Sequence, residues 1–180
     1  MAEYFEDDVQ VKRKVLEFLT VANEYCMFLE KAEEYSLDIL LDFLHRMLPF
    51  LYLKGSLLPK ITTENEDKEE RFVVEQQWED FFNVMKKKFQ SKDLFIKSLA
   101  ADFLPEDVIK GSVSENLADI YQDMKDFVML YTKDTYTSKE IAVLQCQLLF
   151  RTHWGPAALE ILPHLHSLIY DHSTEPESLV

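Results

Sequence analysis

The chain has 180 residues, of which 47% are apolar and 29% charged, and its formal net charge is −14. This is the length of one domain with enough apolar residues for a sizeable core, which excludes wholesale disorder. Only three glycines are present, whereas an average usage of about 7% would give roughly 13. Glycine-rich phosphate-binding loops and a hairpin-rich β-sandwich are therefore excluded, and the composition predicts a helical protein.

The first half of the chain predicts three helices from the spacing of its apolar residues. The first covers about 9–32, and the second covers about 37–53 with Ser36 as its N-cap. The second helix is apolar on nearly all sides, so we expect it to be buried at the centre of the fold. A solvated loop is predicted at 60–70, followed by a third helix at about 70–90.

The segment 91–111 has the least regular pattern, in which a helix over 93–103 is one interpretation. Ser112 and Glu115 then form a capping box that opens a helix ending near residue 132. A second capping box at Thr137 opens the next helix.

Gly155 is predicted to end this helix as its C′ residue, and a last helix is predicted over about 157–170. The sequence therefore predicts a single-domain, all-α bundle of six to seven helices over 1–171. A disordered acidic tail is predicted at 172–180.

The negative charge narrows the choice of partners. Nucleic-acid binding needs a basic face that releases counterions, and the lysine cluster at 86–88 is explained by a helix C-terminus. An acidic surface repels nucleic acid and anionic membranes. We therefore expect neither of these partners, and expect a protein partner that is basic or a second copy of the chain.

We expect a cytoplasmic location. The first residues lack the basic and apolar segments of a secretory signal. The most apolar stretch, 37–53, carries charges that disfavour membrane insertion. Cys26 and Cys146 fall within apolar helical stretches, where a free, buried thiol is expected.

Polar residues on the second helix form a candidate site. Asp38, Asp42 and His45 lie at i, i+4 and i+7 and so share one face. This stripe either faces solvent or meets partners, because an unpaired buried polar group costs about 1–3 kcal/mol. We expect it to meet the helix at 117–125 inside the bundle, near the polar residues Asp119, Tyr121 and Asp123.

A metal site is not predicted. Helical bundles build di-metal sites from two Glu-x-x-His pairs and two further carboxylates. The chain has one related pair, Asp42 and His45. We therefore predict no metal and no cofactor.

Two segments carry a resemblance to a known family. They are Leu-Ala-Asp-Ile-Tyr-Gln-Asp-Met-Lys at 117–125 and Arg-Thr-His-Trp-Gly at 151–155, and the segment 18–26 is also similar. They resemble the domain of unknown function 5063 family, an uncharacterised bacterial family. The resemblance implies a helical bacterial protein and supplies no activity. Family members often have a further histidine just after the His-Trp-Gly segment, where this chain has Pro156 and Ala157.

Two classes of function follow from these observations. We favour a non-enzymatic interaction or regulatory protein with an acidic surface. The alternative is a helical bundle that binds a metal or small ligand, or an enzyme, and the sequence does not decide whether the chain is an enzyme. The candidate polar cluster consists of Asp38, Asp42, His45, Asp119, Tyr121, Asp123, His153 and Trp154.

Overall fold

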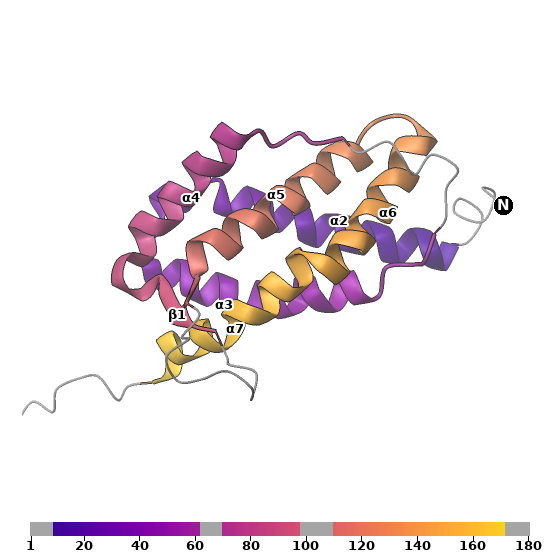
Figure 1. Ribbon diagram of the computed structural model, residues 1–180. Helices are drawn as coiled ribbons and strands as arrows, with labels where there is room; N and C mark the ends of the chain where they lie inside the picture. Colours follow the sequence, from indigo (N-terminus) through magenta and orange to yellow (C-terminus); the bar gives the residue numbers. More distant parts are fainter. Residues whose placement is uncertain (1–8, 62–69, 98–109, 172–180) are drawn as a thin grey trace, which may run out of the picture.

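The structure, a computed structural model, describes residues 9–61, 70–97 and 110–171 (Figure 1). In these ranges the chain forms six α-helices, two short 3₁₀ turns and one pair of three-residue strands, so the predicted all-α bundle is confirmed. The predicted tail at 172–180 lies outside the described residues. The elements are α2 (Val9–Leu29), η1 (Ala32–Glu34), α3 (Leu37–Ser56), α4 (Glu75–Phe89), η2 (Gln90–Lys92), β1 (Leu94–Ile96), β2 (Lys110–Ser112), α5 (Val113–Tyr131), α6 (Tyr136–Thr152) and α7 (Trp154–Tyr170).

The N-terminal caps follow from local sequence. The Ser36 side chain accepts a hydrogen bond from the Ile39 N–H, and the Ser112 side chain accepts one from the Glu115 N–H, as predicted. Helix α6 begins slightly before the predicted position, because Thr135 is its N-cap and accepts from the Ser138 N–H. Each cap satisfies a backbone donor that the helix leaves without an internal partner.

The helix at the centre of the bundle is α5. It packs against α2, α4, α6 and α7, and 13 of its 19 residues are buried. Figure 1 shows α3 along the lower side of the bundle, beside α7. The predicted central position of the 37–53 helix is therefore wrong. One side of α3 packs on α2 and α7, while Ile39, Phe50 and Leu53 on its other side are about half exposed.

Two helix boundaries differ from the prediction for tertiary reasons. Helix α4 begins at Glu75 with Val74 as its N-cap in an extended conformation, and the N–H groups of Phe72 and Val73 before it donate to Asp126 on α5. Gly155 does not end a helix and lies in the first turn of α7. A Cβ atom at this position would be 2.1 Å from the Phe150 carbonyl oxygen, so the glycine permits a close backbone approach.

Residues 94–96, which follow α4, form a strand, so the interpretation of 93–103 as a helix is wrong for these residues. Residues 98–103 lie outside the described residues. Strands β1 and β2 are antiparallel, with Phe95 opposite Gly111. The buried Asp93 carboxylate accepts hydrogen bonds from the Ser114 N–H at 2.7 Å and from the Ser112 hydroxyl at 2.9 Å. This carboxylate thereby fixes the strand pair to the N-terminus of α5.

Gly55 provides a test of the packing between α3 and α7. A Cβ atom at Gly55 would lie 2.2 Å from the ring of Trp154, which is fully buried beside Phe18 and Phe150. Alanine normally favours a helix over glycine by about 1 kcal/mol, but here the clash is larger. We expect Gly55→Ala to lower the free energy of unfolding by about 1–3 kcal/mol.

Urea unfolding followed by circular dichroism measures this effect. The neighbouring exposed residue provides the control, because Ser56→Ala is expected to change the stability by less than about 0.5 kcal/mol. A Gly55→Ala protein as stable as the wild type would contradict the close contact with Trp154.

Candidate functional site

A partly buried polar cluster joins three parts of the chain. His153 lies at the junction between α6 and α7, and its Nδ1 is 2.6 Å from Oδ2 of Asp123 on α5. Its Nε2 is 3.7 Å from Oδ2 of Asp119, one turn earlier on α5. Asp119 also accepts a hydrogen bond from the indole N–H of Trp78 on α4, at 3.0 Å. We call Arg71, Trp78, Asp119, Asp123, Asp126 and His153 the polar cluster.

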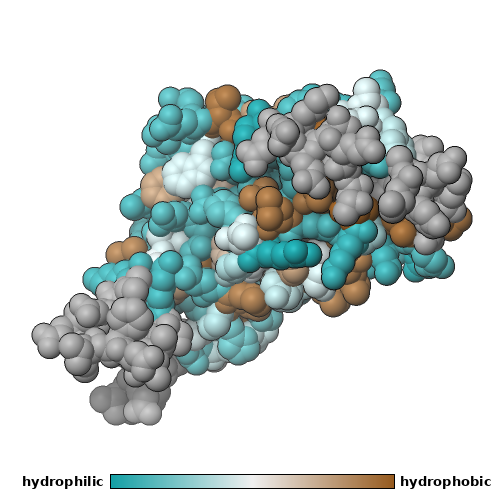
Figure 2. All heavy atoms as spheres, turned by 45° about the vertical axis from the view of Figure 1, so that its right-hand side comes forward, coloured by the Kyte–Doolittle hydropathy of each residue, from teal (hydrophilic) through white to brown (hydrophobic). Residues whose placement is uncertain are grey.

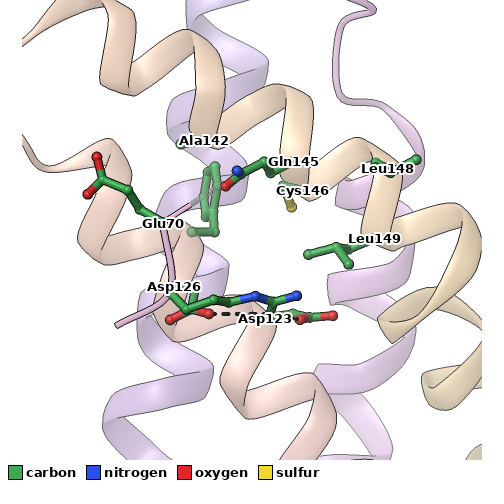
Figure 3. A pocket seen from close by; sticks show the side chains of 10 residues that line it. Glu70, Asp123, Asp126, Ala142, Gln145, Cys146, Leu148 and Leu149 are labelled. Atoms are coloured by element: carbon green, nitrogen blue, oxygen red, sulfur yellow. Dashed lines mark hydrogen bonds and ion pairs between the residues drawn. The ribbon is translucent and has the colours of Figure 1, made fainter. Parts of the chain in front are cut away.

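Arg71 supplies the second cation of the polar cluster. Its Nη1 is 3.2 Å from Asp123 Oδ1 and 3.4 Å from Asp126 Oδ2. Figure 3 shows Asp123 and Asp126 on α5, facing the side chains of Cys146 and Leu149 from α6. Because Asp126 also accepts the two backbone N–H groups before α4, the carboxylates of α5 hold this segment against the bundle.

The charges of the polar cluster partly compensate one another, with Arg71 and His153 facing three carboxylates. The hydrogen bond to Asp123 raises the pKa of His153 above 6.5 and favours the imidazolium ion. Burial raises the pKa values of Asp119 and Asp126, although hydrogen bonds to each carboxylate oppose this shift. Every buried side-chain nitrogen or oxygen atom in the described residues has a hydrogen-bond partner. The polar cluster is therefore an internally satisfied tie between α5, the residues before α4 and the α6–α7 corner.

The cavity beside this cluster is too small for a substrate. Its volume is about 30 Å³, and Arg71, Asp123, Asp126 and Cys146 are among its lining residues (Figure 3). That volume holds one or two water molecules, whereas pockets for small ligands measure roughly 300–1,000 Å³. Burial raises the pKa of the Cys146 thiol well above its ordinary value, so the reactive thiolate is disfavoured.

The structure separates the predicted stripe of α3 from the acids of α5. Asp42 is 62% exposed and pairs with Arg46 of its own helix at 2.5 Å, and Asp38 is exposed. The His45 ring lies against His166 and Tyr170 of α7, at centroid distances of 5.8 and 5.4 Å. The expected meeting of this stripe with the 117–125 helix is wrong, because the outer side of α3 does not face α5.

Two other candidate residues lie apart from the polar cluster. Tyr121 stacks on Phe81, and its hydroxyl donates to Glu30 at 3.0 Å. Trp154 is fully buried in the core, and its indole N–H donates to the Cys146 carbonyl at 3.2 Å. Of the eight candidates, the structure therefore brings together Asp119, Asp123 and His153.

The candidates expected from the sequence do not include Arg71, Trp78 and Asp126, which belong to this cluster. Asp126 had a detectable signal, because Asp119, Asp123 and Asp126 are spaced by four and three residues and share a helix face. Arg71 had no detectable signal, since it follows an acidic loop and its position is typical of a charged side chain exposed to solvent. Trp78 had no signal for a polar role, because its position fits the apolar stripe of α4.

The pKa shift of His153 predicts how stability depends on pH. A pKa raised in the folded state adds stability that is fully present below about pH 6.5 and is lost as the pH rises through the folded value. The melting temperature of His153→Gln should therefore lie further below that of the wild type at pH 6 than at pH 9. In an Asp123→Asn background this pH-dependent difference should disappear, and a difference that persists would contradict the assigned pair.

A second feature is an apolar groove between α2 and α3. Its volume is about 500 Å³, and Phe28 of α2 stacks on Phe43 of α3 within it. Ile39 is 50% exposed, Phe50 45% and Leu53 53%. An α-helix turns by about 100° per residue. These three exposed residues therefore lie, together with Asp42, Phe43 and Arg46, within an arc of about 100° around the axis of α3. We call Ile39, Asp42, Phe43, Arg46, Phe50 and Leu53 the α3 face.

A second pair of exposed hydrophobic side chains, Leu94 and Ile96, lies on β1. The face of the molecule drawn in Figure 2 is mainly hydrophilic, with hydrophobic side chains in small groups. Among the described helices, none combines the length and apolar character needed to cross a membrane. Within the same residues, no group of three His, Cys, Asp or Glu side chains is arranged to hold a metal ion.

The fold and the polar cluster define an all-α bundle tied together by Asp–His and Asp–Arg pairs around its central helix. A family model described as "Domain of unknown function (DUF5063)" matches residues 9–171. The chain therefore belongs to this family, and the resemblance stated from the segments at 117–125 and 151–155 is confirmed.

A solved structure agrees with this assignment. The chain is similar to protein BF1032 from Bacteroides fragilis, whose crystal structure was a Northeast Structural Genomics Consortium target. The sequence identity is 31%, the TM-score is 0.78, and the match covers 98% of this chain and 99% of the other. A search of curated proteins found no match.

Proposed function

We propose that this chain is a non-enzymatic interaction protein of the bacterial cytoplasm, which binds a protein partner through the α3 face. The observation that carries the proposal is the concentration of exposed hydrophobic side chains on α3. Of the 14 large hydrophobic residues exposed in the described part of the chain, four lie on α3 or directly after it: Ile39, Phe50, Leu53 and Leu57. Exposed apolar surface of this kind is typical of protein-binding sites.

The shape of the α3 face supports the same proposal. The groove beside it is open and lined mainly by apolar side chains, with Glu24, Asp42 and Arg46 at its polar positions. Protein interfaces combine an apolar centre with a polar rim in this way. Burial of the three half-exposed residues Ile39, Phe50 and Leu53 would provide the driving force for binding, at about 25 cal/mol per Å² of apolar surface.

The alternative, an enzyme or ligand-binding bundle, has less support. It required the acids of α3 and α5 to converge, and Asp42 pairs with Arg46 on the exposed side of α3. The cavity beside Asp123 holds only one or two waters. A cytoplasmic location is supported by Cys26 and Cys146, which are both free and buried, as is usual in a reducing compartment.

Photo-crosslinking inside bacterial cells tests the proposal. A benzophenone amino acid is placed at Phe50 in one variant and at Leu159 of α7 in a control, because their exposures of 45% and 49% are matched. We expect an adduct from position 50 that is absent from position 159, and mass spectrometry identifies the crosslinked protein and the peptide attached to it. The absence of any adduct from position 50 would contradict the proposal.

A further inference from the structure

The charge of this protein is unevenly distributed over its elements. Helices α2 and α3 together carry five Lys or Arg and four Asp or Glu residues, whereas the whole chain has 19 and 33. Nearly all of the negative charge therefore lies outside these two helices. Two copies with a net charge of −14 repel each other at most orientations. The α2–α3 side, with one more basic than acidic residue, is therefore a side at which a second copy meets little repulsion.

The α3 face is also complementary to itself. In a two-fold symmetric pair of antiparallel helices, the same patch serves both copies. The numbers of any two residues that lie opposite each other then add up to the same value. If the axis passes beside positions 44 and 45, Ile39 of one copy lies opposite Phe50 of the other. In the same arrangement, Asp42 of each copy lies within one residue of the position opposite Arg46 of the other. Ile39 and Phe50 then meet twice and the opposite charges of Asp42 and Arg46 come close twice, whereas Leu53 lies opposite Ser36.

We infer that the partner of the α3 face is a second copy of this chain, in a two-fold dimer with antiparallel α3 helices. This inference rests on the proposed function, because it names the occupant of the same face. The Asp42–Arg46 pair, which is largely exposed within one chain, exchanges in the dimer for two pairs between the chains. The α3 face then leaves water together with the groove beside it.

The size of this surface sets the expected strength of the dimer. A helix of 20 residues is about 30 Å long, and two adjacent helices are about 20 Å wide. The α2–α3 side therefore offers about 600 Å² per copy, somewhat less than the roughly 800 Å² of a standard interface. We expect a reversible dimer whose population rises with protein concentration.

Sedimentation velocity on the full chain, from low to high micromolar concentration, tests the inference. We expect the wild type to shift from monomer to dimer and Phe50→Glu to remain monomeric. Leu159→Glu introduces the same charge at a residue of similar exposure on α7 and should dimerise like the wild type. Circular dichroism and thermal melting establish that each variant is folded.

A charge exchange tests the register of the helices. Asp42→Arg alone and Arg46→Asp alone each place like charges opposite one another, so each should weaken the dimer by about tenfold or more. The double variant Asp42→Arg/Arg46→Asp restores opposite charges in both chains and should restore the dimer. Failure of the double variant to dimerise would overturn the antiparallel register.

The two proposals fail in different ways. A wild type that stays monomeric, or a dimer unaffected by Phe50→Glu, overturns the dimer through the α3 face. If position 50 then crosslinks to a different protein in cells, the proposed function stands and only the identity of the partner changes. A monomer without any crosslink from position 50 overturns both.

Discussion

Asp123→Ala is expected to lower the free energy of unfolding by about 3–5 kcal/mol, because it removes the buried carboxylate that pairs with both Arg71 and His153. The Asp123 side chain is 1% exposed and accepts hydrogen bonds from Arg71 and His153. The side chains of Arg71 and His153 are 46% and 40% exposed and can turn towards water, so we expect the lower end of this range. Urea unfolding followed by circular dichroism measures the change.

The neighbouring carboxylate provides the matched control. Asp119 lies one turn away on the same face of α5, and its side chain is 30% exposed. It accepts one hydrogen bond, from Trp78, so Asp119→Ala should cost only about 1 kcal/mol. If Asp123→Ala costs as little as Asp119→Ala, the polar cluster does not hold the α6–α7 corner to the central helix.

Leu44→Ala is expected to cost about 2–5 kcal/mol through the lost burial of the side chain and the cavity left behind. Leu44 is fully buried on the inner side of α3, between Leu40 and Leu48, which are also buried. The same substitution on the outer side, Leu53→Ala, removes a side chain that is 53% exposed. Its cost should be below about 1 kcal/mol in dilute, monomeric protein.

This pair of substitutions distinguishes the two sides of α3. A large loss at Leu44 with a small loss at Leu53 agrees with a helix that is covered on one side only. Equal losses would indicate that α3 is enclosed on both sides, and the α3 face would then be unavailable to a partner. Both values come from urea unfolding at a concentration where sedimentation shows monomer.

The sequence by itself determined the features that depend on near neighbours in the chain. The apolar spacing located α2, α3 and α5, because a helix places residues three and four apart on one face. Ser36 and Ser112 marked two helix starts, because their hydroxyl groups accept from backbone donors three residues later. These interactions span a few residues, so they can be inferred without knowledge of the fold.

Tertiary structure alone decided which polar residues meet. Asp123 and His153 are 30 residues apart and are joined because α6 ends and α7 begins at His153. Asp42 and His45 have the same residue types and a regular spacing, yet Asp42 pairs with Arg46 on the exposed side of α3 and the His45 ring lies against α7.

The position of each helix in the bundle was also decided by tertiary packing. An apolar pattern shows that a helix has surface to bury, but it does not name the element that covers it. Helix α3 is apolar nearly all round and still keeps Ile39 and Phe50 half exposed, whereas α5 is enclosed by four helices. The residues before α4 are likewise held by a tertiary contact, because Asp126 accepts hydrogen bonds from the N–H groups of Phe72 and Val73. Contacts between distant segments depend on how all the helices pack together, and local spacing contains no record of that arrangement.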